Sequence, residues 1–232
     1  MAHMAALGWV CVSIDYRVGK SAKWPDQIID VKTALAWVRE HVADYGGDPD
    51  FVAITGGSAG GHLAALAALT GEDNDYPPQS GTAAPIRACV PFYGPYDFDN
   101  SLGLRPQGEM RLVERFVVKE SLVGNPTLYE RGAPLARVHQ DAPPFLIVQG
   151  TSDNLVVPAE SREFVDRLRN ASQAVVAYAE VPRAQHAFDA VPSVRTGHVI
   201  TGVERFLTHI HSLHRHTAPS APRGWGAGSR ER

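Results

Sequence analysis

Residues 51–69 read FVAITGGSAGGHLAALAAL, and no other segment of the sequence says more about the fold. Its first five residues form a mostly apolar run with three β-branched residues, which is typical of a buried strand. Its last seven residues are strong helix formers. Between the two runs lies a serine, Ser58, surrounded by small residues: Gly56, Gly57, Ala59 and Gly60. A strand, a glycine-flanked serine and a helix in this order predict a nucleophile elbow, the sharp turn that exposes a reactive serine.

The chemistry of an elbow explains the residues around Ser58. The serine adopts a strained backbone conformation, and side chains two residues to either side would collide with it. We therefore interpret Gly56 and Gly60 as residues that remove this collision. The helix directs its first amides at the serine oxygen, so the amide of Ala59 is the expected oxyanion donor. A phosphate-binding loop is the alternative, but neither GxxxxGK[ST] nor GxGxxG is present.

Length and composition describe an ordinary globular chain. It has 232 residues, 44% of them hydrophobic, and a formal net charge of -3. The 22 Lys and Arg residues are scattered, which argues against a nucleic-acid partner. No apolar run is long enough to span a membrane, and the first residues lack a basic segment followed by a long apolar one. We expect a soluble, cytoplasmic chain, unless a targeting segment precedes Met1.

Cysteine and histidine usage predicts neither a disulfide framework nor a metal site. Cys11 and Cys89 each lie in an apolar run, so buried free thiols are expected. The histidines lack ligand spacing, and we expect no metal and no cofactor. Four histidines near the end of the last predicted helix are interpreted as a solvated helix end: His209, His211, His214 and His216.

Strand-like and helix-like segments alternate along the chain. This alternation predicts an α/β protein with a mostly parallel sheet and helices on both faces. Strands are expected at 9–16, 51–55, 86–92, 145–149 and 175–181, and helices at 26–45, 63–69, 158–170 and 193–213. We expect one catalytic domain over 1–215 and a disordered tail over 216–232. Within residues 98–140 an amphipathic segment predicts either a small insertion over the site or a plain surface helix.

Two loops supply partners for Ser58. A serine needs a base, and the base needs an orienting acid, in the chain order Ser, Asp or Glu, His. Asp153 follows the strand at 145–149 and His186 follows the strand at 175–181, so both lie where the carboxyl ends of parallel strands meet. Asp153 could instead be a simple turn residue. Three other residues are weaker candidates: Glu180 and Asp189 for the acid, and His62, for which we expect a structural role.

Seven motifs follow one another along the chain: GWVCVSIDYR (8–17), WPDQIIDVKTALAWVREH (24–41), YGGDPD (45–50), GGSAGGH (56–62), PFYGPYDF (91–98), PPFLIVQGTSDNLVVP (143–158) and AQHAF (184–188). With these motifs the chain resembles the hormone-sensitive-lipase-like carboxylesterases of the α/β-hydrolase fold. The resemblance runs from about Ala5 to Leu213 and is greatest to actinobacterial lipases and esterases. It implies Ser58 as nucleophile, His186 as general base and then acid, and Asp153 as the residue that orients His186. It also implies an acyl-enzyme reaction on short to medium acyl esters.

One family feature is not found in this sequence. In the family, further oxyanion donors come from an HGGG-type loop upstream of the GWVCVSIDYR match. Gly46 and Gly47 follow Tyr45 and fit a helix C-cap instead. We therefore expect an N-terminally truncated α/β-hydrolase with weak activity. Because the family also has a strand between those matching 9–16 and 51–55, we expect a gap or a rearranged pairing there, which favours instability or self-association into a homo-oligomer.

Two other functions stay open at the level of sequence. A serine peptidase of the prolyl-oligopeptidase type shares the fold and the order of the triad, although GGSAGGH together with YGGDPD favours an esterase. A catalytically silent α/β-hydrolase remnant, acting as a scaffold or binding partner, is the alternative outside enzymes. Both would keep the same fold, and they differ from the esterase in what Ser58 does.

Overall fold

The computed structural model describes residues 2–71 and 75–217. Its centre is a four-stranded sheet in which each strand pairs in parallel with the next along the chain. The strands are β1 (Val52–Gly57), β2 (Ile86–Phe92), β3 (Phe145–Gly150) and β4 (Val176–Val181). The predicted parallel sheet is therefore confirmed, with each of these strands within two residues of its expected bounds.

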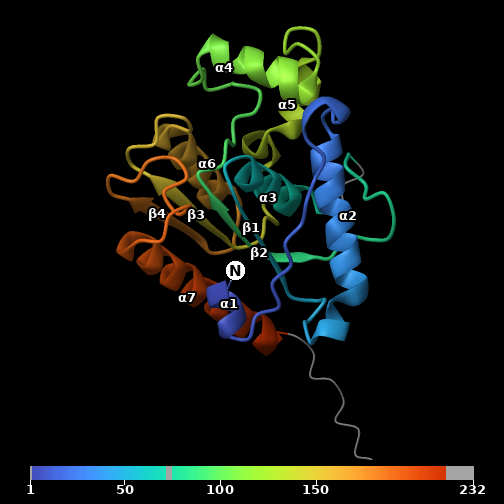
Figure 1. Cartoon of the computed structure of the whole chain (residues 1–232), viewed down its shortest axis with the longest axis vertical. Coiled ribbons are helices and arrows are strands. Elements are labelled where there is room, and N and C mark those ends of the chain that lie inside the picture. The colour runs from blue at the N-terminus through green and yellow to red at the C-terminus, as the bar shows by residue number, and fades with distance from the viewer. Residues whose placement is uncertain (1, 72–74, 218–232) are drawn as a thin grey trace, which may run out of the picture.

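Helices cover both faces of this sheet (Figure 1). One face packs against α3 (Ala59–Thr70) and α6 (Pro158–Ala171), with α2 (Asp26–His41) beside α3. The other face packs against α7 (Val194–Thr217) and the short α1 (Ala2–Ala6). The predicted two-sided helical cover is confirmed. Of the tail predicted over 216–232, residues 216 and 217 belong to α7, and the remaining residues lie outside the part of the chain that the structure describes.

Alternation within β2 shows why a buried parallel strand is apolar on both sides. Ala88 and Val90 belong to the cluster that faces α7, whereas Cys89 between them belongs to the cluster that faces α3 and α6. Successive side chains of a strand point to opposite faces, so a sheet with two covered faces needs apolar residues at every position. Burial raises the pKa of the Cys89 thiol, as expected for a buried cysteine. Cys11 is only partly buried, so the expectation of a buried thiol is wrong there.

The expectation of a strand at 9–16 is wrong. This segment has no assigned strand structure, and a cavity of about 520 Å³ separates it from β1. Val10, Val12 and Ile14 line the cavity and are 39%, 42% and 37% exposed. The sequence pattern is that of a strand, but a strand also needs a hydrogen-bonded neighbour, and none of the described residues lies in that position. The expected gap is what the structure contains.

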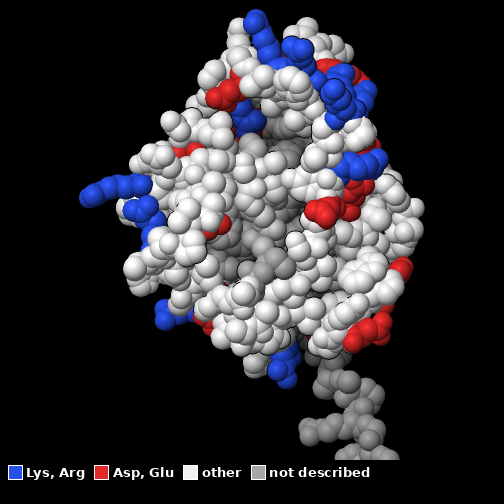
Figure 2. Space-filling model, viewed as in Figure 1, with Lys and Arg blue, Asp and Glu red and all other residues white. Residues whose placement is uncertain are grey.

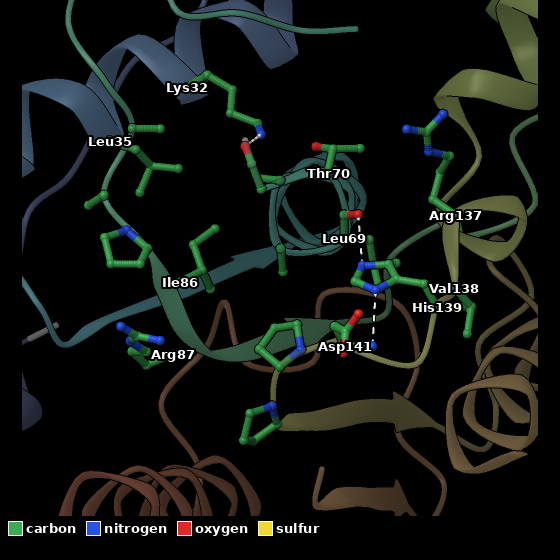
Figure 3. A pocket seen from close by; sticks show the side chains of 18 of the residues that line it. Lys32, Leu35, Leu69, Thr70, Ile86, Arg87, Arg137, Val138, His139 and Asp141 are labelled. Atoms are coloured by element: carbon green, nitrogen blue, oxygen red, sulfur yellow. Dashed lines mark hydrogen bonds between the residues drawn. The ribbon is translucent and has the colours of Figure 1, made fainter. Parts of the chain in front are cut away.

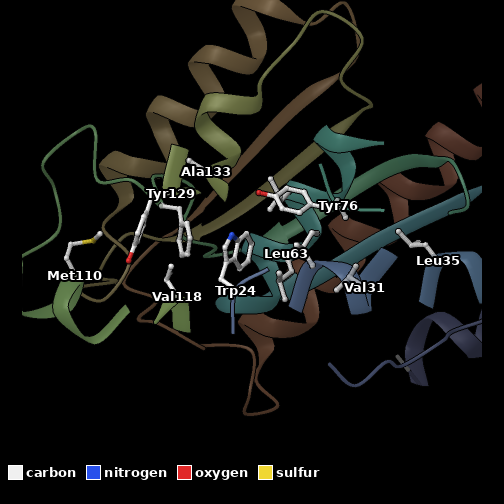
Figure 4. Packing of buried hydrophobic residues seen from close by; sticks show 13 residues of the cluster. Trp24, Val31, Leu35, Leu63, Tyr76, Met110, Val118, Tyr129 and Ala133 are labelled. Atoms are coloured by element: carbon white, nitrogen blue, oxygen red, sulfur yellow. The ribbon is translucent and has the colours of Figure 1, made fainter. Parts of the chain in front are cut away.

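Residues 98–140 form a group of short helices at the top of Figure 1 rather than one surface helix. Their apolar residues join a cluster around Trp24 that includes Phe98, Met110 and Tyr129 (Figure 4). Leu112 and Phe116 instead remain 57% exposed. The elements are α4 (Gln107–Leu112), a π-helix (Val113–Val118), α5 (Pro126–Gly132) and a 3-10 turn (Pro134–Arg137). Other 3-10 turns are Gly19–Ser21 and Val42–Tyr45, the latter capped by Gly46.

A second cavity, of about 840 Å³, lies at the amino end of β2 (Figure 3). The buried Lys32 of α2 reaches the cavity and donates a hydrogen bond to the carbonyl of Gly71, just past the end of α3. A cation is favourable there because helix C-termini carry partial negative charge. Since β2 runs from Ile86 to Phe92, this cavity is at the opposite end of the strand from Ser58.

Candidate active site

Ser58 lies at a sharp turn between β1 and α3. Its backbone has φ 56° and ψ -121°, a conformation that side-chain-bearing residues rarely adopt. Two hydrogen bonds hold it there: the Ser58 N–H donates to the Phe92 carbonyl at 3.0 Å, and the Ser58 carbonyl accepts from the His62 N–H at 3.0 Å. The first links the turn to the end of β2 and the second to the first turn of α3. This geometry matches the predicted elbow.

The glycines of the elbow have different roles from those expected. A Cβ atom at Gly56 would lie 2.4 Å from the carbonyl oxygen of Gly60, so only glycine fits at position 56. A Cβ atom at Gly60 itself would meet nothing within 4 Å, so our interpretation of that glycine is wrong. The close approach instead involves Gly61, where a Cβ atom would lie 2.7 Å from the Phe92 carbonyl oxygen. Gly56 and Gly61 thus allow α3 to pack tightly against the ends of β1 and β2.

The structure brings Ser58, Asp153 and His186 together. His186 Nε2 lies 2.8 Å from Ser58 Oγ, and His186 Nδ1 lies 2.9 Å from Asp153 Oδ2. The Asp153 side chain is fully buried, whereas that of His186 is 17% exposed. Since an ionised carboxylate only accepts, His186 Nδ1 carries the proton and Nε2 is left to accept one from Ser58. This is the arrangement in which a serine can be activated.

Four hydrogen bonds satisfy the buried Asp153 carboxylate. Oδ1 accepts from the backbone amides of Leu155 and Val156, each at 3.0 Å. Oδ2 accepts from His186 and, at 3.1 Å, from Nε2 of Gln149. Both oxygens of the buried carboxylate therefore have hydrogen-bond partners, which hold the side chain in one orientation. From the sequence we assigned no role to Gln149, although it lies only four residues before Asp153.

Backbone contacts tie the Asp153 loop to the His186 loop. The Ser152 N–H donates to the Ala184 carbonyl at 2.9 Å, and the Arg183 N–H donates to Thr151 Oγ1 at 2.8 Å. A Cβ atom at Gly150 would lie 2.4 Å from the Ala184 carbonyl oxygen, so glycine permits this approach. Both loops follow neighbouring parallel strands, β3 and β4, which explains how residues 33 positions apart meet.

The weaker candidates lie outside this arrangement. Glu180 pairs with Arg162 and accepts from the Tyr178 hydroxyl at 2.8 Å, and Asp189 accepts from the Tyr93 hydroxyl. His62 is buried, and its Nδ1 donates to the Pro95 carbonyl at 2.8 Å. Burial lowers the pKa of His62 to about 4, so its ring is neutral at pH 7. Within residues 2–71 and 75–217, no group of three or more His, Cys, Asp and Glu side chains could hold a metal ion.

The expected oxyanion donor has a suitable place in the fold. Helix α3 begins at Ala59, directly after Ser58. The first amides of a helix have no acceptor within it, and together they carry partial positive charge. These general properties of a helix start keep the Ala59 N–H as our proposed oxyanion donor beside Ser58.

With this geometry in place, comparison with known proteins identifies the family. The model of the BD-FAE family matches residues 1–168. The chain belongs to the BD-FAE family. Two curated relatives come from Mycobacterium tuberculosis: the probable carboxylic ester hydrolase LipM, 48% identical over 91% of this chain, and the esterase LipQ, 47% identical over 91%. These matches confirm the resemblance to hormone-sensitive-lipase-like carboxylesterases.

Solved structures confirm the α/β-hydrolase fold of this BD-FAE chain. Esterase 2 of Thermogutta terrifontis, phosphonylated by sarin, superposes with a TM-score of 0.70 at 27% identity, over 84% of this chain and 71% of that one. The chain spans 49% of the length of LipM and 50% of that of LipQ, about half of each. Among the described residues, no helix has both the length and the apolar character needed to cross a membrane.

Proposed function

We propose that this chain is a serine carboxylesterase that hydrolyses short to medium acyl esters through an acyl-enzyme on Ser58. The observation that carries the proposal is the hydrogen-bonded series Ser58, His186 and Asp153, with distances of 2.8 Å and 2.9 Å. The names of the curated relatives support ester hydrolysis. The T. terrifontis esterase has been solved with propionate and with butyrate bound, which supports short acyl groups.

The geometry leads to a two-step reaction. As Ser58 Oγ attacks the ester carbonyl carbon, His186 Nε2 takes the hydroxyl proton, and Asp153 stabilises the imidazolium that forms. The tetrahedral intermediate collapses, and His186 returns the proton to the departing alcohol. Water then attacks the acyl-enzyme and loses a proton to His186. As the second tetrahedral intermediate collapses, the bond to Ser58 Oγ breaks, His186 returns the proton to Oγ, and the carboxylic acid leaves.

The Ala59 amide is the oxyanion donor that we assign within the described residues. Loss of one donor from an oxyanion hole lowers turnover by about 100- to 1,000-fold. Because residues 1–232 contain no HGGG-type loop to supply further donors, we expect Ser58-dependent but slow turnover from this chain. The reaction converts an ester and water to a carboxylic acid and an alcohol, so it needs no cofactor.

The experiment compares hydrolysis of p-nitrophenyl acetate and butyrate with cleavage of a prolyl peptide amide. Wild-type protein, Ser58→Ala and a matched control, Ser212→Ala on the exposed side of α7, are assayed together. We expect ester turnover by wild type and Ser212→Ala, and none above background by Ser58→Ala. Preferential cleavage of the peptide amide would favour a peptidase, and inertness of wild type towards esters and an organophosphonate probe would favour a silent remnant.

A further inference from the structure

The ring of Tyr93 lies between the nucleophile turn and His186. Tyr93 follows β2 with φ 37°, and its N–H donates to the Val148 carbonyl at 2.7 Å. On one side, a Cβ atom added at Gly57 would lie 2.9 Å from the Tyr93 hydroxyl oxygen. On the other side, the ring centroids of Tyr93 and His186 are 4.8 Å apart. Tyr93 therefore touches both the residue before Ser58 and the base that would activate it.

The Tyr93 hydroxyl is anchored beyond His186. It donates a hydrogen bond to Oδ1 of Asp189, three residues after His186 and 96 residues from Tyr93. Phe188 packs edge-on against the same ring, with centroids 5.9 Å apart. Burial, and then the Asp189 carboxylate, raise the pKa of Tyr93 well above its usual range. The phenol keeps its proton and remains the donor.

The loop that carries His186 needs such an anchor. Arg183 and Ala187, on either side of His186, have φ values of 55° and 56°. Non-glycine residues with positive φ are strained, and this strain persists only where surrounding contacts impose it. The contacts before His186 come from the β3 loop, through Thr151. After His186, the Tyr93–Asp189 hydrogen bond provides a contact to a different strand end.

We propose that Tyr93 and Asp189 form a positioning pair that holds the His186 ring between Ser58 and Asp153. The inference rests on the proposed ester hydrolysis, and it adds residues that act through His186 rather than on the substrate. It also gives Asp189 a role other than the triad acid for which it was a candidate. Gly57 fits the same picture, since a side chain there would displace the Tyr93 hydroxyl.

Four variants test the pair by separating kcat from KM for p-nitrophenyl butyrate. Tyr93→Phe and Asp189→Ala each remove the hydrogen bond, and Asp189→Asn keeps an oxygen acceptor for Tyr93. Tyr178→Phe is the matched control, because it removes a tyrosine–carboxylate hydrogen bond, to Glu180, on β4. We expect kcat to fall about 5- to 50-fold in the first two, since small misplacements of a reacting group are costly, with KM within about twofold. In Asp189→Asn, log kcat should regain at least half of the decrease seen in Asp189→Ala.

A second readout separates this inference from the proposed function. The Nδ1 proton between His186 and Asp153 should give a low-field proton NMR signal without any substrate. The signal should broaden or disappear in Tyr93→Phe and Asp189→Ala, and stay in Tyr178→Phe, even if wild type hydrolyses no ester. An unchanged signal in Tyr93→Phe and Asp189→Ala would overturn the positioning role. If wild type is active, three kinetic results would also overturn it: a fall in kcat of less than fivefold in both Tyr93→Phe and Asp189→Ala, an equal fall in kcat in Tyr178→Phe, or no recovery of kcat in Asp189→Asn.

Discussion

Replacing Asp153 by asparagine is the substitution whose effect the structure defines most closely. Oδ1 of the carboxylate accepts hydrogen bonds from two backbone amides, and Oδ2 accepts hydrogen bonds from His186 and Gln149. Asparagine has one oxygen and one NH₂ group. The backbone amides of Leu155 and Val156 are fixed donors, so the oxygen remains on their side. The NH₂ group then faces His186 and Gln149.

This orientation reverses the His186 tautomer. Nδ1 must accept from the new NH₂ group, so the proton moves to Nε2, which lies 2.8 Å from Ser58 Oγ. Nε2 can then no longer accept the Ser58 proton. We expect kcat to fall about 10³- to 10⁴-fold, or about 4 to 5.5 kcal/mol of activation free energy, with little change in KM. The free energy of unfolding should fall by about 1–3 kcal/mol, since the buried site loses a charged acceptor.

The assay measures p-nitrophenyl butyrate hydrolysis and, for a wider range, the second-order rate of Ser58 phosphonylation by a fluorophosphonate. Circular dichroism and a urea melt confirm that the variant is folded under assay conditions. Asp166→Asn, an exposed carboxylate on α6, is the matched control and should keep wild-type rates. A folded Asp153→Asn protein with kcat within tenfold of wild type would refute the assignment of Asp153 as the orienting acid.

Three further predictions concern the buried side chains of His62 and Glu160 and the glycines of the elbow. His62 has a pKa of about 4 when folded and 6.5 as its unperturbed value, so unfolding takes up a proton between these pH values. The His62 contribution to stability is therefore full above about pH 6.5 and falls by about 3 kcal/mol towards pH 4. In urea melts, the free energies of unfolding of wild type and His62→Gln should converge as the pH falls through this range. Parallel pH dependences of the two proteins would contradict this. Glu160→Gln should lower the free energy of unfolding by about 3–5 kcal/mol, because Glu160 and Arg105 form a buried ion pair at 2.8 Å. Glu163→Gln breaks the exposed ion pair with Arg167 and should lower the free energy of unfolding by under about 1 kcal/mol. Gly56→Ala should destabilise the protein by about 2–4 kcal/mol through collision with Gly60, whereas thermal melts should show Gly60→Ala to be tolerated; equal melting temperatures would contradict the elbow geometry.

Much of the architecture could be predicted because its signals are local. The apolar run before Ser58 and the helix formers after it specify β1 and α3 whatever lies elsewhere in the chain. The positions of Asp153 and His186 after successive strands place them at one sheet edge, because parallel strands share their carboxyl ends. Local pattern and topology together were therefore sufficient to bring the three side chains to one place.

Other features depend on partners that a local pattern does not contain. Residues 9–16 have a strand sequence, yet they stay unpaired because a cavity separates them from β1. Gly60 matches the elbow pattern, but the close contact is made from Gly56 to its backbone. The Tyr93–Asp189 hydrogen bond joins residues 96 positions apart through side chains alone. Such contacts follow from the packed structure and not from residue spacing.

Localisation of a fluorophosphonate adduct by mass spectrometry determines whether His186 activates Ser58. We expect a single adduct on Ser58 in wild-type protein, which disappears in Ser58→Ala and forms at least about 100-fold more slowly in His186→Ala. An adduct on another residue, or equal labelling of Ser58 in wild type and His186→Ala, would contradict it.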